Sequence, residues 1–384
     1  MGLGETYTAG DWTAEPNPTE FLKLLIRAKN EFMTTHQCKE QTKYVEPRTS
    51  SPLERLAVSV SELVLAVVRQ IVSNYSYIQH RIRDNTLTQS AKKYSWSANG
   101  NSISNSSTRN HYDLGNDMFR MFLDPSMTYS CAIFQEPLER VEKVNFEVLE
   151  EAQQRKIDRL IDMLDLRETD RVLEIGCGWG ACAIRAVKKS QCYWTGLTIS
   201  HEQLEWAKRK AVEEGLHDKI CFKYEDYRLA TGQYDKIISV EMIEAVGEAF
   251  LPQYFKVLSD RLVSGGIAVL QGIICPDIYY ERYCKSSDFI KKYIFPGGHM
   301  PSLGAIQLSL PNDLTIGEIQ HIGRHYANTL DHWYSAWMKN EENILALGYS
   351  KSFHRLWQYY FSLCSALFAN DHIDAVQFIL TKSI

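Results

Sequence analysis

The sequence predicts an α/β protein built on a parallel, doubly wound β-sheet and preceded by a small helical domain. Three observations support this prediction. Short apolar segments alternate with helical segments beyond Val141, which is typical of strand–helix–strand units. One of the predicted strands ends in three closely spaced glycines. In the amino-terminal part, apolar residues instead recur at three- and four-residue spacing, as on one face of a helix.

The amino-terminal part is predicted to be helical over roughly its first 95 residues. Thr19 is placed to cap a helix that carries Phe21, Leu24 and Leu25. A further helix is predicted at 53–71, where eight aliphatic residues follow the i, i+3, i+4, i+7 rule. We expect its apolar face to pack against neighbouring helices or, alternatively, to rest on a membrane or a partner.

Residues 96–108 are rich in Ser and Asn and are predicted to link the helical domain, 1–95, to an α/β domain, 109–384. The α/β domain is expected to begin with a helix at Val141–Leu164. The predicted strands are Arg171–Ile175, Cys192–Leu197, Ile220–Lys223, Lys236–Val240 and Ile267–Gln271, with a helix at His201–Glu214 between the second and third. Aromatic residues become dense beyond Pro276, and most of them are expected to form core.

Composition excludes several classes of protein. With 45% hydrophobic residues and a net charge of -5 over 384 residues, the chain is neither mainly disordered nor a typical nucleic-acid binder. Its nine cysteines include no CxxC pair, so we expect neither a metal site nor a disulfide framework. The segment MGLGETYTAGDW lacks the features of a signal peptide, and the longest apolar stretch, Leu56–Val72, is interrupted by Glu62 and Arg69. These features predict a cytoplasmic protein.

The glycine loop gives the most specific local pattern. A dinucleotide-binding loop reads GxGxxG and is followed by an acid at the end of the next strand. Here Gly176, Gly178 and Gly180 are evenly spaced, and the next strand ends in the uncharged segment 196–200. Together with Glu174 they form the Glu-x-Gly-x-Gly-x-Gly loop that binds S-adenosylmethionine (SAM). The alternative is a tight strand–helix turn without a ligand.

Further motifs extend along nearly the whole chain. They are GLGETYTAGDW at 2–12, HYDLGND at 111–117, MTYSCA at 127–132, EMIEAVG at 241–247 and YIFPGG at 293–298. With these motifs the chain resembles the cyclopropane-fatty-acid synthase family of SAM-dependent methyltransferases, which includes mycolic-acid methyltransferases and coclaurine N-methyltransferases. The resemblance implies a Rossmann-like methyltransferase fold and an enzyme that acts with SAM.

The resemblance also implies roles for individual residues in binding SAM. Tyr129 and Ser130 match contacts to the methionine end of the cofactor. The remaining cofactor positions are Glu174, Gly176, Gly178 and Gly180 in the cradle, Thr198 and Gln203 at the ribose, and Asp226 and Tyr227 on the adenine side.

A second ligand implied by the resemblance is bicarbonate, which acts as a base beside the transferred methyl group. The matching pocket residues are Cys131, Glu244, Ile273 and Tyr326, plus a His whose position reads Gln271 here. Glutamine can donate an amide hydrogen bond to an anion but carries no charge. Cys364 matches a cysteine proposed as nucleophile in the family, but its apolar helical setting favours an inert core thiol.

The chemistry itself explains why such residues are needed. An alkene that attacks the methyl group of SAM becomes a carbocation, which aromatic faces can shelter and from which a base must remove one proton. We expect Glu244 either to orient bicarbonate or to accept the proton itself. An ionised Glu244 would repel bicarbonate, so its pKa is expected to be raised.

The leading hypothesis is therefore methyl transfer to an unsaturated acyl chain, in a phospholipid, with transient docking on a membrane. The product would be a cyclopropane or a methyl- or methylene-branched lipid. Methylation of a soluble amine of the alkaloid type is the alternative enzyme hypothesis, and a non-catalytic SAM or lipid sensor is a third. No nucleic-acid partner is expected, and a homodimer is compatible with the sequence.

Overall fold

The computed structural model describes residues 2–41, of which 31–41 as backbone only, and residues 114–384. The predicted helix at 53–71, the linker 96–108 and the first three residues of the HYDLGND motif lie outside the described residues. In the described part, no helix is both long enough and apolar enough to cross a bilayer.

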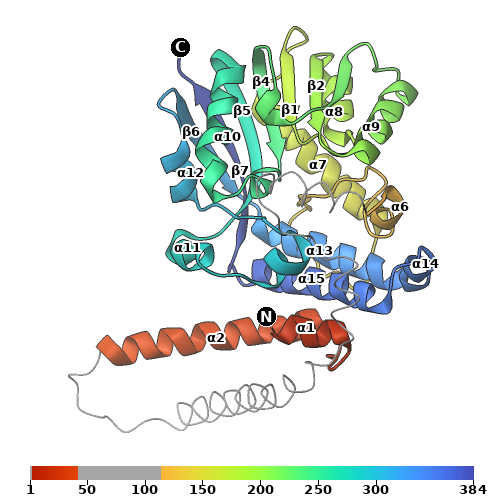
Figure 1. Ribbon diagram of the computed structural model, residues 1–384, viewed down its shortest axis with the longest axis vertical. Helices are drawn as coiled ribbons and strands as arrows, with labels where there is room; N and C mark the ends of the chain where they lie inside the picture. The colour runs from red at the N-terminus through yellow and green to blue at the C-terminus, as the bar shows by residue number, and fades with distance from the viewer. Residues whose placement is uncertain (1, 42–113) are drawn as a thin grey trace, which may run out of the picture.

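A seven-stranded sheet with the order β3-β2-β1-β4-β5-β7-β6 forms the centre of the α/β domain (Figure 1). The strands are β1 (Arg171–Ile175), β2 (Tyr193–Thr198), β3 (Ile220–Tyr224), β4 (Tyr234–Val240), β5 (Leu262–Ile274), β6 (Leu314–His321) and β7 (Asp374–Lys382). The first five are parallel, which confirms the predicted doubly wound sheet. β7 is antiparallel to both β5 and β6, and this antiparallel pair at the β6 end of the sheet is absent from the predicted elements.

Helices cover both faces of the sheet. One apolar cluster joins the sheet to α7 (Phe146–Leu164), α8 (Ala181–Ser190) and α9 (His201–Glu213). A second cluster joins the other face to α10 (Leu251–Arg261) and α12 (Leu303–Ser309). The predicted helix at Val141–Leu164 begins five residues later than expected, because Asn145 caps it by accepting hydrogen bonds from Glu147 N and Val148 N.

A third group of helices lies beneath the sheet in Figure 1. It comprises α13 (Gly323–Lys339), α14 (Glu341–Ala346) and α15 (Lys351–Ala369), with α6 (Asn116–Phe119) and α11 (Asp277–Cys284) at its sides. Shorter helical turns are η1 (Tyr227–Leu229), η2 (Ile243–Ala245), η3 (Glu248–Phe250) and η4 (Ile290–Ile294). Aromatic residues of α13 and α15, such as Trp333, Trp337 and Trp357, are fully buried, as expected for core.

The amino-terminal helices α1 (Gly2–Ala9) and α2 (Pro18–Gln41) pack on α15 (Figure 1). A side chain on Gly4 would come within 2.5 Å of Phe289, so a glycine is required for this close approach. Arg355 of α15 donates hydrogen bonds to Tyr7 O, at 2.6 Å, and to Trp12 O, at 2.8 Å. The GLGETYTAGDW segment is therefore bound to the α/β domain.

The predicted cap of α2 is wrong by two residues. The Asn17 side chain, and not that of Thr19, accepts the hydrogen bond from Glu20 N, at 3.1 Å. Pro18 then occupies the first helical position, where its missing N–H costs nothing.

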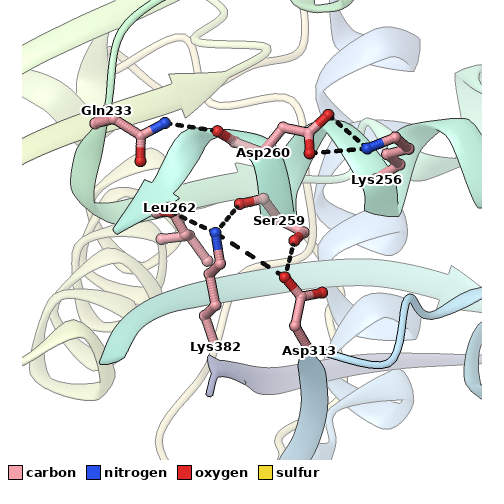
Figure 2. Close-up of polar contacts among 7 residues, drawn as sticks. All are labelled: Gln233, Lys256, Ser259, Asp260, Leu262, Asp313 and Lys382. Carbon is pink, nitrogen blue, oxygen red and sulfur yellow. Dashed lines mark hydrogen bonds and ion pairs between the residues drawn. The ribbon is translucent and has the colours of Figure 1, made fainter. Parts of the chain in front are cut away.

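The antiparallel edge is tied to the end of α10, as Figure 2 shows. Lys382, at the end of β7, donates to the carbonyl oxygens of Ser259, at 2.7 Å, and Leu262, at 2.9 Å. Ser259 Oγ in turn donates to Asp313, at 2.5 Å. A cation thus satisfies the last carbonyl groups of the helix, where the helix dipole favours positive charge.

Candidate active site

The glycine loop connects β1 to α8 with a backbone that only glycine adopts easily. Gly176, Gly178 and Gly180 have φ angles of 82°, 51° and 90°, in the left-handed region. A side chain on Gly178 would meet no described atom within 4 Å, so it would project into open space, whereas one on Gly180 would come within 2.9 Å of Phe222. Gly178 therefore leaves room for a ligand, and Gly180 serves packing.

The loop borders a cavity at the carboxyl ends of β1, β2 and β4, which we call the glycine-loop cavity. Of the ten predicted cofactor residues, all but Gly180 line it. These nine residues are Tyr129, Ser130, Glu174, Gly176, Gly178, Thr198, Gln203, Asp226 and Tyr227. Motifs that lie up to about a hundred residues apart in the sequence thus meet around one space.

Hydrogen bonds fix the polar side chains on one side of this cavity. Thr198 Oγ1 donates to Gln203 Oε1 at 2.7 Å. Asp226 accepts a two-pronged contact from Arg228, with Nη2 at 2.6 Å and Nε at 3.0 Å. The residues matched to the ribose and adenine are therefore preorganised before any ligand arrives.

At the other side of the cavity, an acid and a base are buried close together. Glu174 accepts a hydrogen bond from Trp194 Nε1 at 2.8 Å, and burial raises its pKa to about 7. Lys156, only 1% exposed, donates to Ser130 Oγ at 2.7 Å, and burial lowers its pKa. Lys156 is not among the predicted site residues, although a lysine on the apolar stripe of α7 is an unusual feature that marks it in the sequence.

The shape and polar groups of this cavity fit SAM. The glycine turn leaves open space beside Gly178. Glu174 offers an acceptor for the ammonium group of an amino acid, while Lys156 and Ser130 offer donors for its carboxylate. A zwitterionic end of a ligand would therefore find a complementary partner for each charge.

Glu241, directly after β4, is the centre of a buried hydrogen-bond network. Its Oε1 accepts from Cys131 N and from Gln271 Nε2, both at 2.8 Å, and its Oε2 accepts from Tyr326 OH at 2.6 Å. Its backbone has a φ of 50°, which is rare for a residue other than glycine. Glu241 belongs to the EMIEAVG motif but is not among the predicted site residues.

The neighbouring acid, Glu244, has one carboxyl oxygen satisfied and one not. Ile273 N donates to its Oε1, while its Oε2 is buried and has no hydrogen-bond partner among the described residues. Burial, and then the charge of Glu241, raises the pKa of Glu244, which confirms the predicted direction. Because three donors stabilise the charge on Glu241, we place the shared proton of this pair on Glu244.

A second cavity, of about 940 Å³, extends from these acids toward α2, α11 and α15. We call it the apolar cavity. Three of the predicted catalytic residues, Glu244, Ile273 and Tyr326, line it together with Cys364. Tyr129, Glu241 and Ala245 line both cavities, so the two spaces meet at these three residues.

Cys131 and Gln271 line neither of these two cavities in the described part of the chain. The Cys131 thiol is fully buried and donates to the carbonyl oxygens of Ala132 and Ile322. Both polar atoms of the Gln271 side chain are hydrogen-bonded within the protein. Its Nε2 donates to Glu241 and to Cys131 O, and its Oε1 accepts from Gln377. Both residues therefore donate hydrogen bonds to Glu241, Cys131 through its backbone N–H and Gln271 through its side-chain amide.

The Cys364 thiol has no activating environment. Burial raises its pKa, whereas a nucleophilic cysteine requires a lowered one. His325, in the first turn of α13, accepts a hydrogen bond from Phe134 N at 3.3 Å, and burial lowers its pKa. That contact supports a structural role for this histidine.

The chain is similar to known proteins both in sequence and in fold. The family model of mycolic acid cyclopropane synthetase matches residues 101–378. The tuberculostearic acid methyltransferase UfaA1 of Mycobacterium tuberculosis is 33% identical over 384 residues, which cover 100% of this chain and 79% of that protein. The cyclopropane-fatty-acyl-phospholipid synthase of Escherichia coli K12 is 34% identical over 280 residues, covering 72% of this chain and 68% of that protein. A solved structure of mycolic acid cyclopropane synthase CmaA1, complexed with SAH and CTAB, is similar with a TM-score of 0.66 and 30% identity, covering 74% of this chain and 100% of that one.

Proposed function

The chain belongs to the mycolic acid cyclopropane synthetase family of SAM-dependent methyltransferases, and from this premise we propose that it methylates the double bond of an unsaturated acyl chain in a phospholipid. The product would be a cyclopropane or a methyl- or methylene-branched chain. One observation carries the proposal: a large cavity lined mainly by apolar and aromatic side chains meets the glycine-loop cavity at Tyr129, Glu241 and Ala245.

The junction of the two cavities suits an alkene. Aromatic rings of Tyr129, Phe295, Tyr326 and Tyr360 line the apolar cavity, and such faces stabilise a cation without reacting with it. Tyr129 OH and Tyr360 OH are hydrogen-bonded at 3.0 Å, which holds two of these rings in place. An acyl chain has no polar groups along its length, so no hydrogen bonds to water are lost when it enters such an apolar cavity.

The outer part of the apolar cavity suits a lipid at a membrane surface. Ile278 and Tyr279 of α11 are 82% and 41% exposed, and both line the cavity together with the cations Lys29 and Arg282. The Tyr279 ring stacks on His372, with centroids 5.2 Å apart, and Lys29 acts electrostatically on that same histidine. Apolar side chains beside cations fit the boundary between acyl chains and phosphate groups.

This arrangement also gives the amino-terminal part a role. Lys29 and Asn30 of α2 contribute to the lining of the apolar cavity. We therefore propose that the helical domain, predicted as 1–95, completes the substrate side of the enzyme and leaves cofactor binding to the α/β domain.

The mechanism needs little covalent participation by the protein. SAM, when bound, supplies an electrophilic methyl group. Glu174, Lys156 and Ser130 would orient its amino-acid end, and Tyr129 would hold the junction of the two cavities. Glu244 Oε2, which has no partner among the described residues, is the group proposed to control removal of the proton from the carbocation. Loss of that proton from the delivered methyl group closes a ring, and loss from a neighbouring carbon leaves a branch.

Bicarbonate, if it serves as the base, must be held chiefly by Glu244. The Tyr326 hydroxyl donates to Glu241, and the Gln271 amide is used within the protein. A protonated Glu244 would donate a hydrogen bond to the anion, and activity would then fall as pH rises through its pKa. A Glu244 that itself accepts the proton predicts the opposite slope, because the ionised form is then the active one. The pH–rate profile with and without bicarbonate distinguishes these two mechanisms.

The function is tested with SAM that carries an isotopic label in its methyl group. The full chain is incubated with vesicles of a monounsaturated phospholipid, with vesicles of the saturated analogue and with a panel of soluble amines. We expect label in the acyl chains of the unsaturated lipid alone, detected by mass spectrometry. Label in the amines, with none in the lipid, would refute the proposal and favour N-methylation.

A further inference from the structure

Three side chains of different chemistry converge beside the apolar cavity. They are Glu248 at the start of η3, Cys284 at the end of α11 and His299 in the loop that follows the YIFPGG motif. One donor atom from each lies within 4.8 Å of the other two. We infer that these three residues form a binding site for a transition-metal dication of the zinc class.

The donor set favours this class of ion. A thiol, an imidazole and a carboxylate together match zinc and its neighbours, whereas calcium and magnesium prefer oxygen ligands alone. Bonds of about 2.0–2.3 Å to a tetrahedral ion place two ligand atoms roughly 3.3–3.8 Å apart. Because the donor atoms lie within 4.8 Å of one another, they need to approach by at most about 1.5 Å, and the exposed Glu248 side chain can rotate to do so.

The histidine is held in place from two sides. His299 is 7% exposed, and its backbone N–H donates to Glu244 O at 2.8 Å. On the following residue, Met300 N donates to Tyr283 OH at 3.0 Å. The rigid part of the site is thus the least accessible ligand, while the two more exposed ligands approach it from α11 and η3.

A tyrosine completes the cluster. Tyr280 OH lies 2.8 Å from His299 Nε2, and it also interacts with the Cys284 thiol. In the absence of an ion this hydroxyl satisfies the imidazole nitrogen. An incoming cation would displace it or take it as a fourth ligand, in place of a water molecule.

The position of the site gives it a consequence for the enzyme. α11 supplies Ile278, Tyr279 and Arg282 to the lining of the apolar cavity, and it carries Cys284 at its last position. An ion bound by Cys284, Glu248 and His299 would fix this helix to η3, which carries Glu248, and to the loop that carries His299. That loop is hydrogen-bonded to Glu244 O. The metal site would therefore stabilise the wall of the substrate cavity, and it does not depend on which substrate the enzyme takes.

The test measures metal binding directly, in the absence of SAM and lipid. The full chain is freed of metal with a chelator and titrated with Zn²⁺ in competition with a chromophoric chelator, and separately with Co²⁺. We expect one equivalent of bound metal and, for Co²⁺, a thiolate-to-metal charge-transfer band in the near ultraviolet. Cys284→Ser should abolish the band, and Cys284→Ser and Glu248→Gln should each weaken Zn²⁺ binding by more than the ~10–100-fold that loss of an outer-shell partner costs.

Cys221→Ser is the matched control, because Cys221 is also exposed but lies on β3, outside the cluster. It should leave both the stoichiometry and the band unchanged. Glu248 is exposed, so Glu248→Gln reports on the site even if a variant of the buried His299 fails to fold. The proposal is overturned if no metal binds, or if one equivalent binds with equal affinity to the protein, Cys284→Ser and Glu248→Gln.

Discussion

The glycine-loop cavity and the apolar cavity are built in different ways. The first is formed mainly by the ends of neighbouring strands, and each strand contributes a short run such as Gly176–Gly178 or Thr198–Ser200. The second is enclosed by α2, α11, η4, α13 and α15, which lie far apart in the sequence. The fold of the sheet thus fixes the cofactor side, while long-range helix packing shapes the substrate side. In the proposed mechanism, the reaction takes place where the two cavities meet, at Tyr129, Glu241 and Ala245.

The largest expected effect separates the functions of the two cavities. Glu244→Gln keeps the shape of the side chain but removes the exchangeable proton, so we expect turnover to fall by about 10²–10⁴. Because Glu244 lines the apolar cavity and not the glycine-loop cavity, SAM affinity should change little. Single-turnover kinetics and calorimetry measure the two quantities.

Glu281→Gln is the control for this experiment, since Glu281 is an exposed acid on α11 that pairs with Lys285. It should retain full turnover. If Glu244→Gln turns over normally and bicarbonate affects neither protein, proton removal does not depend on this carboxyl group and the carbocation mechanism loses its base.

The next effect concerns the other cavity. Gly178→Val places a branched side chain in the space beside the loop and adds backbone strain of about 1–3 kcal/mol at a positive φ. We expect SAM affinity to fall at least ~100-fold, equivalent to about 2.7 kcal/mol. Gly215→Val controls for strain, because Gly215 also has a positive φ with no described atom near its Cβ position but lies outside the cavity. Equal SAM affinity for Gly178→Val and the native protein would contradict the assignment.

The difference between the cavities also explains what the sequence could predict. The five parallel strands and the nine predicted cofactor residues that line the glycine-loop cavity lie in short motifs, and a strand and the turn after it are local structures. Glu241 and Lys156 were missed because their roles depend on partners distant in the sequence, such as Tyr326 and Ser130.

The antiparallel strands β6 and β7 were not predicted for a related reason. β7 is stabilised by pairing with β5, more than a hundred residues earlier, and nothing in its own composition marks it as antiparallel. Cys131 and Gln271 illustrate the same limit, since their motif matches predict proximity to the site but not that both would hydrogen-bond to Glu241 without lining either cavity.

A pH-dependent effect is expected at the buried acid of the glycine-loop cavity. Burial raises the pKa of Glu174 from 4.5 to about 7, so between these values the folded chain keeps a proton that the unfolded chain has lost. Stability should therefore decrease as pH rises from about 4.5 to 7, by up to ~3 kcal/mol, and the loss should persist above that range. Glu174→Gln should flatten this part of the profile relative to the native protein, as measured by urea unfolding without SAM. A variant of the exposed Glu168 should leave the slope unchanged, and an equal slope in Glu174→Gln would contradict the expectation.

A smaller effect tests how the amino-terminal motif supports the apolar cavity. Glu5 accepts hydrogen bonds from Lys292 Nζ, at 2.7 Å, and from Tyr293 OH, and these residues belong to η4, which contributes Ile290 and Lys291 to the cavity lining. Glu5→Gln removes a partly exposed ion pair, so we expect KM for vesicles to rise about three- to tenfold with little change in SAM affinity. Glu20→Gln, which breaks the surface pair with Lys23 on α2, should change neither. A rise in the SAM dissociation constant of Glu5→Gln would show that the motif serves the cofactor side instead.

The smallest change in turnover is expected for Cys364, which matches a cysteine proposed as nucleophile in the family. Cys364 lines the apolar cavity, but burial raises its pKa, and no described histidine or cation interacts with its sulfur to form a thiolate. Direct attack of an alkene on a methyl group also requires no covalent intermediate with the enzyme. Cys364→Ser should therefore retain turnover within about threefold, the residual loss reflecting a hydroxyl group in an apolar wall at ~1 kcal/mol or less. If turnover instead falls by several orders of magnitude in a folded variant that still binds SAM, Cys364 acts as a nucleophile. The reaction would then involve α15 in the apolar cavity, and not only the junction of the two cavities.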